Sequence, residues 1–353
     1  MGDLLQKTLA SIGELDAAAM SRAQARQNSL AKPAGSLGVL EELSIRLAGI
    51  RRGWEKGLEE KVIIVMAGDH GAVEEGVTAY PQEVTQQMLA NFVRGGAAIN
   101  VLARHAGARV VVVDMGTAAQ ESIEGVLNFK VRQGTGNIAR GPAMTREEAT
   151  AAIEAGIKIA QEEIEKGAQV VGTGDMGIGN TTPSSAILAA FSSLPPEKFV
   201  GRGTGVDETG WRRKVGAIYK ALEVNAPDPR DPLDVLSKVG GLEIAGIAGC
   251  ILGAAARRVP AVIDGFISTA GALIAARLQP RAKEFMIASH LSAEPGHRFM
   301  LELLGLEPVL RMNLRLGEGT GAALVMPLLD AALKILNEMA TFASAGVSEK
   351  IER

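Results

Sequence analysis

The hydrophobic residues of this chain fall into short, wholly apolar runs that alternate with longer stretches of helical periodicity. The apolar runs predict buried strands at 62–66, 109–113, 169–171, 261–263 and 284–288, with one more near 126–131. Apolar residues three and four positions apart predict amphipathic helices at 3–28, 37–51, 81–92, 97–105, 145–166, 182–191, 207–222, 242–256, 265–278, 294–304 and 317–342. This alternation predicts an α/β fold, a Rossmann-like parallel sheet with helices on both faces.

Two helical stretches have no strand beside them in the chain. They are the first helix and the end of the last one. We expect residues 1–30 and 331–353 to pack together as a small helical domain, and residues 31–330 to form the large α/β domain that carries the catalytic site.

The composition limits which partners and which cellular compartment we expect for this protein. The formal net charge is −3, which gives no electrostatic reason to expect nucleic acid or an anionic membrane as a partner. Cys250 is the single cysteine, which excludes an internal disulfide framework and fits a reducing compartment. The sequence shows no charged-then-apolar leader and no apolar run of membrane-spanning length. We therefore expect a soluble, cytoplasmic protein.

Residues 171–185 form the most informative stretch. Glycines at 172, 174, 177 and 179 follow the apolar end of a strand, and a helix starts after them. Thr182 suits the N-cap of that helix and Pro183 its first position. Backbone N–H groups at such a helix start bind anions, phosphate above all, and Asn180, Thr181 and Thr182 add side-chain donors. The stretch therefore predicts a phosphate cradle.

The same glycines allow two other interpretations. Gly172, Gly174 and Gly177 spell the G-x-G-x-x-G fingerprint of dinucleotide binding. That fingerprint needs a second strand ending in an acidic residue about 20 residues further on, and residues 192–196, Ser-Ser-Leu-Pro-Pro, offer none. A glycine-rich turn without a ligand is the other interpretation.

Several polar turns directly follow the predicted strands. They contain Asp69 and His70, Asp114, Asp264, and the run from Ser289 to Ser292. Because ligands of such sheets bind beyond the carboxyl ends of the strands, we expect these turns to surround one pocket.

A metal centre is not expected. The four histidines are too scattered for a zinc motif; Asp69, His70 and Asp114 would be the weak candidates for a divalent ion. A serine or cysteine nucleophile lacks support too, since there is no G-x-S-x-G elbow and Cys250 lies in an apolar helix.

Five blocks of sequence, in this order, resemble the nicotinate-nucleotide:dimethylbenzimidazole phosphoribosyltransferase family, which makes the lower ligand of cobalamin. They are KPAGSLG at 32–38, AGDHG at 67–71, EGVTAYP at 75–81, MGIGNTT at 176–182 and RLGEG at 315–319. The resemblance covers nearly the whole chain. One departure is Asp175, where the family usually has glutamate; one methylene of reach is lost.

The resemblance implies a reaction. A benzimidazole nitrogen displaces nicotinate from the anomeric carbon of nicotinate mononucleotide with inversion. The leaving group departs from a cationic pyridinium and needs no acid, whereas the attacking base must lose an N–H proton, so one general base suffices. The family's catalytic glutamate falls on Glu318, between Gly317 and Gly319. The alternative is that Glu318 only caps the following helix.

The resemblance also implies residues that bind the substrates. For the phosphate and ribose they are Asp175, Gly177, Ile178, Gly179, Asn180, Thr181, Thr182, Gly203, Lys214 and Ser292. For the aromatic base they are Thr78, Tyr80 and Gln86. Ser292 could instead be a plain N-cap, and Tyr80 and Met88 could be core residues.

No cofactor is expected, and the resemblance implies a homodimer. Dimethylbenzimidazole, other benzimidazoles, adenine and phenols would all fit a flat apolar slot. Two other classes of function stay open at this point. One is a nicotinamide-dependent oxidoreductase using the 172–177 glycines, and the other is a non-catalytic nucleotide sensor.

Overall fold

A six-stranded, wholly parallel sheet forms the centre of the computed structural model, which describes residues 2–203 and 205–348. The strands are β1 Lys61–Gly68, β2 Ala108–Gly116, β3 Leu127–Asn128, β4 Val170–Met176, β5 Ala261–Ile263 and β6 Met286–Ala288. Their order is β3-β2-β1-β4-β5-β6. The central pair β1 and β4 is buried along nearly its whole length, in register from Lys61 opposite Val170 to Ala67 opposite Met176. The predicted α/β fold is confirmed.

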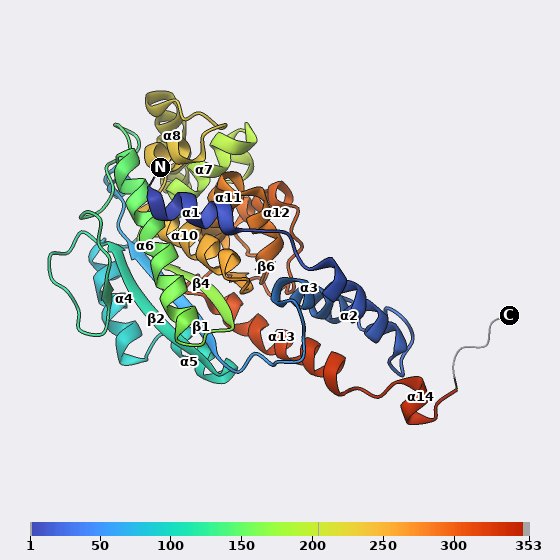
Figure 1. The fold of residues 1–353 in the computed structure, drawn as a ribbon. Helices are drawn as coiled ribbons and strands as arrows, with labels where there is room; N and C mark the ends of the chain where they lie inside the picture. Colours follow the sequence, from blue (N-terminus) through green and yellow to red (C-terminus); the bar gives the residue numbers. More distant parts are fainter. Residues whose placement is uncertain (1, 204, 349–353) are drawn as a thin grey trace.

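Helices cover both faces of this sheet (Figure 1). They are α1 Asp3–Ser11, α2 Ala17–Ser29, α3 Val39–Arg51, α4 Glu83–Arg94, α5 Ala98–Ala106, α6 Arg146–Glu165, α7 Thr181–Ser192, α8 Glu208–Asn225, α9 Pro232–Val239, α10 Leu242–Ala256, α11 Phe266–Leu278, α12 Pro295–Leu304, α13 Thr320–Glu338 and α14 Phe342–Ala345, with short 3₁₀ turns at Gly71–Glu75, Pro196–Lys198 and Pro280–Phe285. One apolar cluster joins α6, α10 and α11 to the sheet, with α1 outside them. A second cluster joins α3, α5 and α13 to the opposite face.

Several element boundaries differ from the sequence-based expectations. The helix expected at 3–28 is two helices, because residues 12–16 are not helical. The Asp16 carboxylate caps α2 by accepting from Ala19 N at 2.8 Å. The strand expected to end at Val171 continues to Met176. Helix α7 begins at Thr181 with Asn180 as its N-cap, so Thr182 is not the cap. The last long helix ends at Glu338, short of the expected 342.

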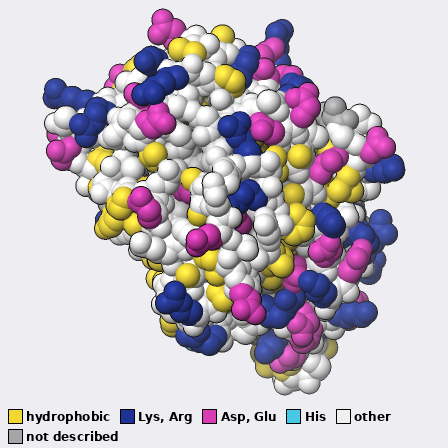
Figure 2. Space-filling model, turned by 90° about the vertical axis from the view of Figure 1, so that its left-hand side faces the viewer, with side chains coloured by type: hydrophobic (Ala, Val, Ile, Leu, Met, Phe, Trp, Pro, Cys, Tyr) yellow, Lys and Arg dark blue, Asp and Glu magenta, His cyan; other side chains and the backbone are white. Residues whose placement is uncertain are grey.

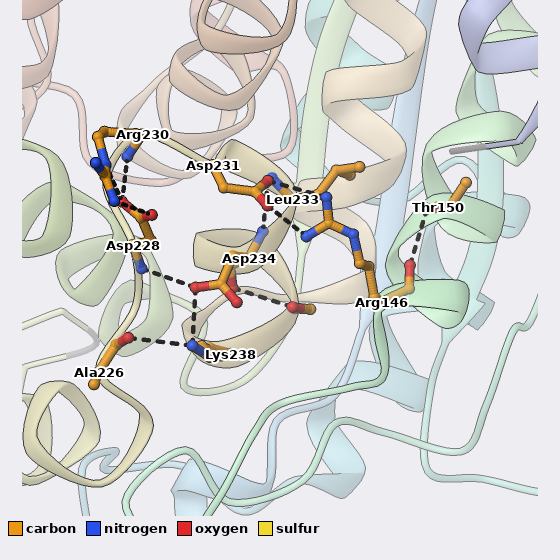
Figure 3. Close-up of polar contacts among 10 residues, drawn as sticks. Arg146, Thr150, Ala226, Asp228, Arg230, Asp231, Leu233, Asp234 and Lys238 are labelled. Carbon is orange, nitrogen blue, oxygen red and sulfur yellow. Dashed lines mark hydrogen bonds and ion pairs between the residues drawn. The ribbon is translucent and has the colours of Figure 1, made fainter.

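Helix α9 was not expected from the sequence. The Asp231 carboxylate caps it by accepting from the backbone N–H of Leu233 at 3.1 Å and of Asp234 at 3.3 Å. Arg146, at the start of α6, donates to both oxygens of the same carboxylate, at 2.7 and 3.2 Å (Figure 3). This bidentate contact ties the amino ends of α6 and α9 together.

The two amino-terminal helices pack in different places. Helix α2 packs on α3 and on the far end of α13, away from the sheet, through Ala23, Ala48 and Leu336 (Figure 1). Helix α1 packs instead on α6 and α10. A separate small helical domain stays a prediction; residues 1 and 349–353 of that prediction lie outside the described residues.

Helix α13 meets the length and hydropathy criteria of a membrane span, contrary to the expectation that no such run exists. Since 56% of the apolar segment of α13 is buried inside the protein, this is weak support for a span, and core helices pass the same test.

On the face shown in Figure 2, basic and acidic side chains are interspersed.

Candidate active site

A cavity of about 420 Å³ opens at the carboxyl edge of the sheet. Part of its wall follows strands, as the strand-end argument predicted: the 175–181 segment at the end of β4, the start of α11 after β5, and the turn after β6. The rest comes from residues 80–88, Gly203 and the 315–318 segment before α13. Of the predicted site residues, the cavity is lined by Tyr80, Asp175, Gly177, Ile178, Asn180, Thr181, Gly203, Ser292 and Glu318.

Glycines in β4 allow the segment before α13 to lie directly against the strand. A Cβ at Gly174 would lie 2.5 Å from the carbonyl oxygen of Glu318, and one at Gly172 would lie 2.9 Å from Met326 Cε. Gly172 and Gly174 therefore serve close packing inside a strand and do not form the turn that dinucleotide binding requires. The strand beside β4, β5, ends at Ile263 with Asp264 directly after it, far more than 20 residues along the chain.

Glu318 lies in an unusual backbone turn. Gly317, Glu318 and Gly319 all have positive φ, at 86°, 64° and 91°. Asp264 holds the turn, because its carboxylate accepts from the backbone N–H of Gly319, Gly321 and Ala322 at 3.2, 2.7 and 3.2 Å. This carboxylate is fully buried, and burial raises its pKa to about 7.

The Glu318 carboxylate reaches the start of α5. Its Oε2 accepts from the backbone N–H of Ile99 at 3.1 Å, and the side chain lines the cavity while only 6% of the residue is exposed. Burial raises the pKa of this carboxyl, and the bond from Ile99 opposes that effect. A carboxylate with a raised pKa beside a cavity is suited to accept a proton.

Asp175 is fixed by a neighbour of the same turn. Its Oδ2 accepts from Asn180 Nδ2 at 3.0 Å, whereas Oδ1 is buried without a hydrogen-bond partner among the described residues. Burial, and then the nearby Asp264 carboxylate, raise the pKa of Asp175 well above its ordinary value. Oδ1 is therefore a polar atom still lacking a partner in the cavity wall.

Lys214 lies behind the start of α7. Its Nζ donates to Thr181 Oγ1 at 2.7 Å and to the Gly201 carbonyl at 3.4 Å. The side chain is fully buried, and burial lowers its pKa to about 8. Gly203, at φ 53°, leaves room here, since a Cβ would lie 3.1 Å from this amine. The structure thus brings Thr181, Gly203 and Lys214 together.

The remaining predicted residues do not line the cavity. Gly179 and Thr182 lie in and behind the turn after β4, and Thr182 is fully buried. Thr78 accepts from the backbone N–H of Tyr80 at 3.3 Å, and Gln86 donates to the Glu121 carbonyl at 3.0 Å. Tyr80 itself is 53% exposed, so it is not a core residue.

Sequence reasoning missed other lining residues. They are Val84, Met176, Gly265, Phe266, Ile267, His290, Glu294, Arg315 and Leu316; Met88, for which a core position was the alternative, lines the cavity too. Gly265 and His290 follow β5 and β6 almost directly, so the strand-end rule reached their neighbourhood without assigning them a role. Within the described part of the chain, no group of three or more histidine, cysteine or acidic side chains is placed to hold a metal ion.

A parallel sheet whose carboxyl edge carries a buried lysine, a glycine turn at a helix start and a buried carboxylate defines an α/β enzyme for an anionic small molecule. The comparisons with known proteins specify which one. A family model described as phosphoribosyltransferase matches residues 12–347, and the chain belongs to that family.

Several similar proteins carry one name, nicotinate-nucleotide–dimethylbenzimidazole phosphoribosyltransferase. The one from Desulforamulus reducens is 57% identical over 348 residues, covering 98% of this chain and 99% of its own. The one from Geotalea uraniireducens is 56% identical over the same length, with the same coverage. A crystal structure of the enzyme of this name from Thermus thermophilus matches with a TM-score of 0.90 and 48% identity, covering 95% of this chain and all of that one.

Proposed function

We propose that the protein transfers the 5-phosphoribosyl group of nicotinate mononucleotide to 5,6-dimethylbenzimidazole in the assembly of the cobalamin nucleotide loop. The products are α-ribazole 5′-phosphate and nicotinate. The names of the relatives support the reaction, and the cavity of about 420 Å³ is of the size expected for small-molecule substrates.

The reaction divides the chemical work unevenly between the two substrates. A nitrogen lone pair of the benzimidazole forms the bond to the anomeric carbon while the bond to nicotinate breaks. The bond's electron pair stays on the pyridine nitrogen, which thereby loses its positive charge. The other benzimidazole nitrogen gives up its proton, so the enzyme must supply one base.

We propose Glu318 as that base. The observation that carries this assignment is its place in the cavity wall, on a left-handed residue whose turn is held by three amides on Asp264. One carboxylate oxygen is fixed by the Ile99 amide, which leaves the other for the substrate. Tyr80, Val84 and Met88 supply the apolar wall against which a flat base would pack.

We assign the phosphate to the start of α7, with Thr181 and Gly203 in contact and Lys214 behind them as the counter-charge. Gly177, Ile178, Gly179, Asn180 and Thr182 complete that turn, and Asp175 and Ser292 adjoin it. Thr78 and Gln86 support the Tyr80 side of the base slot.

The test is an assay with Glu318→Gln. Wild type incubated with both substrates should release nicotinate and form the α-ribotide, measured by chromatography. The variant should lose on the order of 10²–10⁴-fold in turnover, the usual contribution of a general base, while still binding the nucleotide. Glu307→Gln, at a side chain that is 92% exposed, is the matched control and should keep full turnover.

Two results would contradict the proposal in different ways. A Glu318→Gln enzyme with near-normal turnover would exclude the base assignment alone. A wild type that binds the nucleotide and releases no nicotinate with dimethylbenzimidazole, adenine or a phenol would exclude the transferase, leaving a nucleotide sensor.

We also propose a homodimer in the cytoplasm. The resemblance supports the dimer, and the exposed apolar side chains of Tyr80 and Leu316 beside the cavity offer a surface for a second copy. A single, buried cysteine fits a reducing compartment. Light scattering should give twice the chain mass of 36.8 kDa, and a value of one chain mass would exclude the dimer.

A further inference from the structure

The imidazole of His290 lies in the cavity wall, directly after β6, and the function proposed above leaves it without a role. Its Nδ1 is 2.9 Å from Ser289 Oγ, and the same hydroxyl is 3.1 Å from the Asp264 carbonyl oxygen. A carbonyl only accepts, so the one hydroxyl proton of Ser289 goes to it. Nδ1 of His290 must therefore carry a proton and donate it to Ser289.

With Nδ1 engaged inward, Nε2 is the ring nitrogen left for the cavity. No hydrogen bond to Nε2 is found among the described residues. In the neutral ring with Nδ1 protonated, Nε2 is unprotonated and can only accept. Burial lowers the pKa of His290 to about 4, so the ring is neutral at neutral pH. Glycine neighbours fix its place: a Cβ at Gly321 would lie 2.0 Å from Nδ1, and one at Gly265 would lie 3.7 Å from Nε2. The cavity wall thus presents one oriented, uncharged acceptor.

The neighbouring His297 shows the contrast. Its Nδ1 accepts from the backbone N–H of Ser292 at 2.8 Å. Its Nε2 is 2.9 Å from Thr269 Oγ1, whose own proton goes to the Gly265 carbonyl at 2.8 Å, so Nε2 donates. Both nitrogens of His297 are satisfied by the protein, although the two rings are only 6.0 Å apart. His297 has a structural role, and His290 has a free acceptor.

The nucleotide offers few groups that match such an acceptor. Its phosphate and its nicotinate carboxylate only accept, and its pyridinium nitrogen carries no proton. The ribose hydroxyls are its only strong donors. The benzimidazole N–H is the other donor at hand, but its proposed slot follows β1, three strand spacings from β6, or about 14 Å at the usual strand separation.

We propose that Nε2 of His290 accepts a hydrogen bond from a ribose hydroxyl of the nucleotide substrate and so positions the sugar between the phosphate site and Glu318. This inference rests on the proposed function, because it takes the ligand to be nicotinate mononucleotide. His290 is here a positioning residue, which binds the sugar and takes no proton during the reaction.

The first test needs no variant. Binding of nicotinate mononucleotide and of its 2′-deoxy and 3′-deoxy forms to wild type is measured by calorimetry without the acceptor base. One deoxy form should bind roughly three- to tenfold more weakly, the size of one neutral hydrogen bond. Equal binding of all three nucleotides would overturn the proposal even if every His290 variant failed to fold.

The second test is a double-mutant cycle. His290→Asn keeps a donor near Ser289 and removes the acceptor, so it should raise KM for the parent nucleotide roughly three- to tenfold with little change in kcat. That loss should vanish with the deoxy form that wild type binds poorly. His290→Gln, which returns an acceptor near the position of Nε2, should recover part of the loss. His297→Gln is the matched control and should leave the penalty for the missing hydroxyl as in wild type.

An equal loss of His290→Asn on parent and deoxy nucleotides would overturn the proposal. The outcomes also separate this inference from the function on which it rests. Hydroxyl-dependent binding without nicotinate release contradicts the transferase and leaves the His290 contact standing. Transfer without any hydroxyl dependence contradicts the contact alone.

Discussion

Glu318 is one of the few residues other than glycine, among those that the structure describes, with a left-handed backbone. A left-handed conformation costs a residue with a side chain on the order of 1–3 kcal/mol, and flanking glycines avoid that cost at the neighbouring positions. A plain helix cap would not require this, because caps are normally extended. Three backbone amides on the buried Asp264 carboxylate hold the strained turn, which supports a role that depends on where the Glu318 carboxylate points.

The pH dependence of turnover tests two residues of the site at once. Burial raises the pKa of Glu318 above 4.5 and lowers that of Lys214 to about 8. A base must be deprotonated and a phosphate counter-ion protonated. The value of kcat/KM for the nucleotide should therefore rise with pH through the pKa of Glu318 and decline above about 8.

Two variants assign the limbs of that profile. Arginine keeps its charge far above pH 8. In Lys214→Arg the alkaline decline of kcat/KM should therefore shift to higher pH. Glu318→Gln should lose the acid limb. An acid limb that persists in Glu318→Gln would point to Asp175 or Asp264 instead, whose pKa values burial also raises.

At the scale of elements, α6 and α10 pack backbone against backbone. A Cβ at Gly249 would lie 1.9 Å from the Ile153 carbonyl oxygen, and one at Gly156 would lie 2.0 Å from that of Gly246. Because backbone cannot move aside locally, Gly249→Ala should lower the free energy of unfolding by about 1–3 kcal/mol or more. Urea denaturation followed by circular dichroism measures this.

Gly216→Ala is the control for that experiment. Gly216 is an exposed residue inside α8, and a Cβ there would meet nothing within 4 Å. Alanine in an open helical position should stabilise the protein by about 0.5–1 kcal/mol. Two glycine-to-alanine changes of opposite sign would show that packing of α6 on α10 decides the first one. A stable Gly249→Ala protein would mean that the two helices separate easily.

The elements also show what the sequence can predict. Strands β1 and β2 were found because their side chains are apolar, whereas β4 was cut short at Val171 because glycine contributes nothing to an apolar pattern. The glycines of β4 are required by close packing against the segment before α13, which is distant in the chain. Helix α9 was missed although Asp231 and Pro232 are a favourable helix start.

The candidate site, too, could be predicted from the sequence only in part. Strand ends located the turns around the cavity, and the resemblance supplied Glu318 and Lys214. The acceptor on His290 could not be predicted, since it depends on where Ser289 sends its proton, and Asp264 fixes that from another strand. Such roles depend on tertiary hydrogen bonding that no spacing in the sequence encodes.

For the whole molecule, ionisable groups buried at the carboxyl edge of the sheet set how stability depends on pH. Burial raises the pKa of Asp264 from 3.8 to about 7. Burial alone would lower the pKa of His70, but the Glu243 carboxylate 2.9 Å away outweighs it and raises that pKa above 6.5. At a pH between its unfolded and its folded pKa, each group binds more protons in the folded chain than in the unfolded chain. Their contribution to stability is therefore lost as the pH rises.

Other buried groups titrate mainly outside the interval from pH 6.5 to 8. His290 and His297 have pKa values lowered by burial to about 4 and 3, so their effect on stability lies mostly below about pH 6.5. Lys214, lowered from 10.5 to about 8, acts mostly above pH 8, where rising pH favours the folded state. Between pH 6.5 and 8 only the tails of these titrations remain, and the groups with raised pKa, Asp264, Asp175 and His70, oppose them with one common sign.

The thermal midpoint of the ligand-free protein should therefore be lower at pH 8 than at pH 6.5, as scanning calorimetry would show. Glu243→Gln removes the carboxylate that raises the pKa of His70, so its decline over the same interval should be shallower, with the Asp264 part remaining. The comparison uses the difference between two pH values within each protein, so an overall loss of stability in the variant does not disturb it. A wild-type midpoint that holds or rises between pH 6.5 and 8 would show that these buried groups do not titrate as their surroundings require.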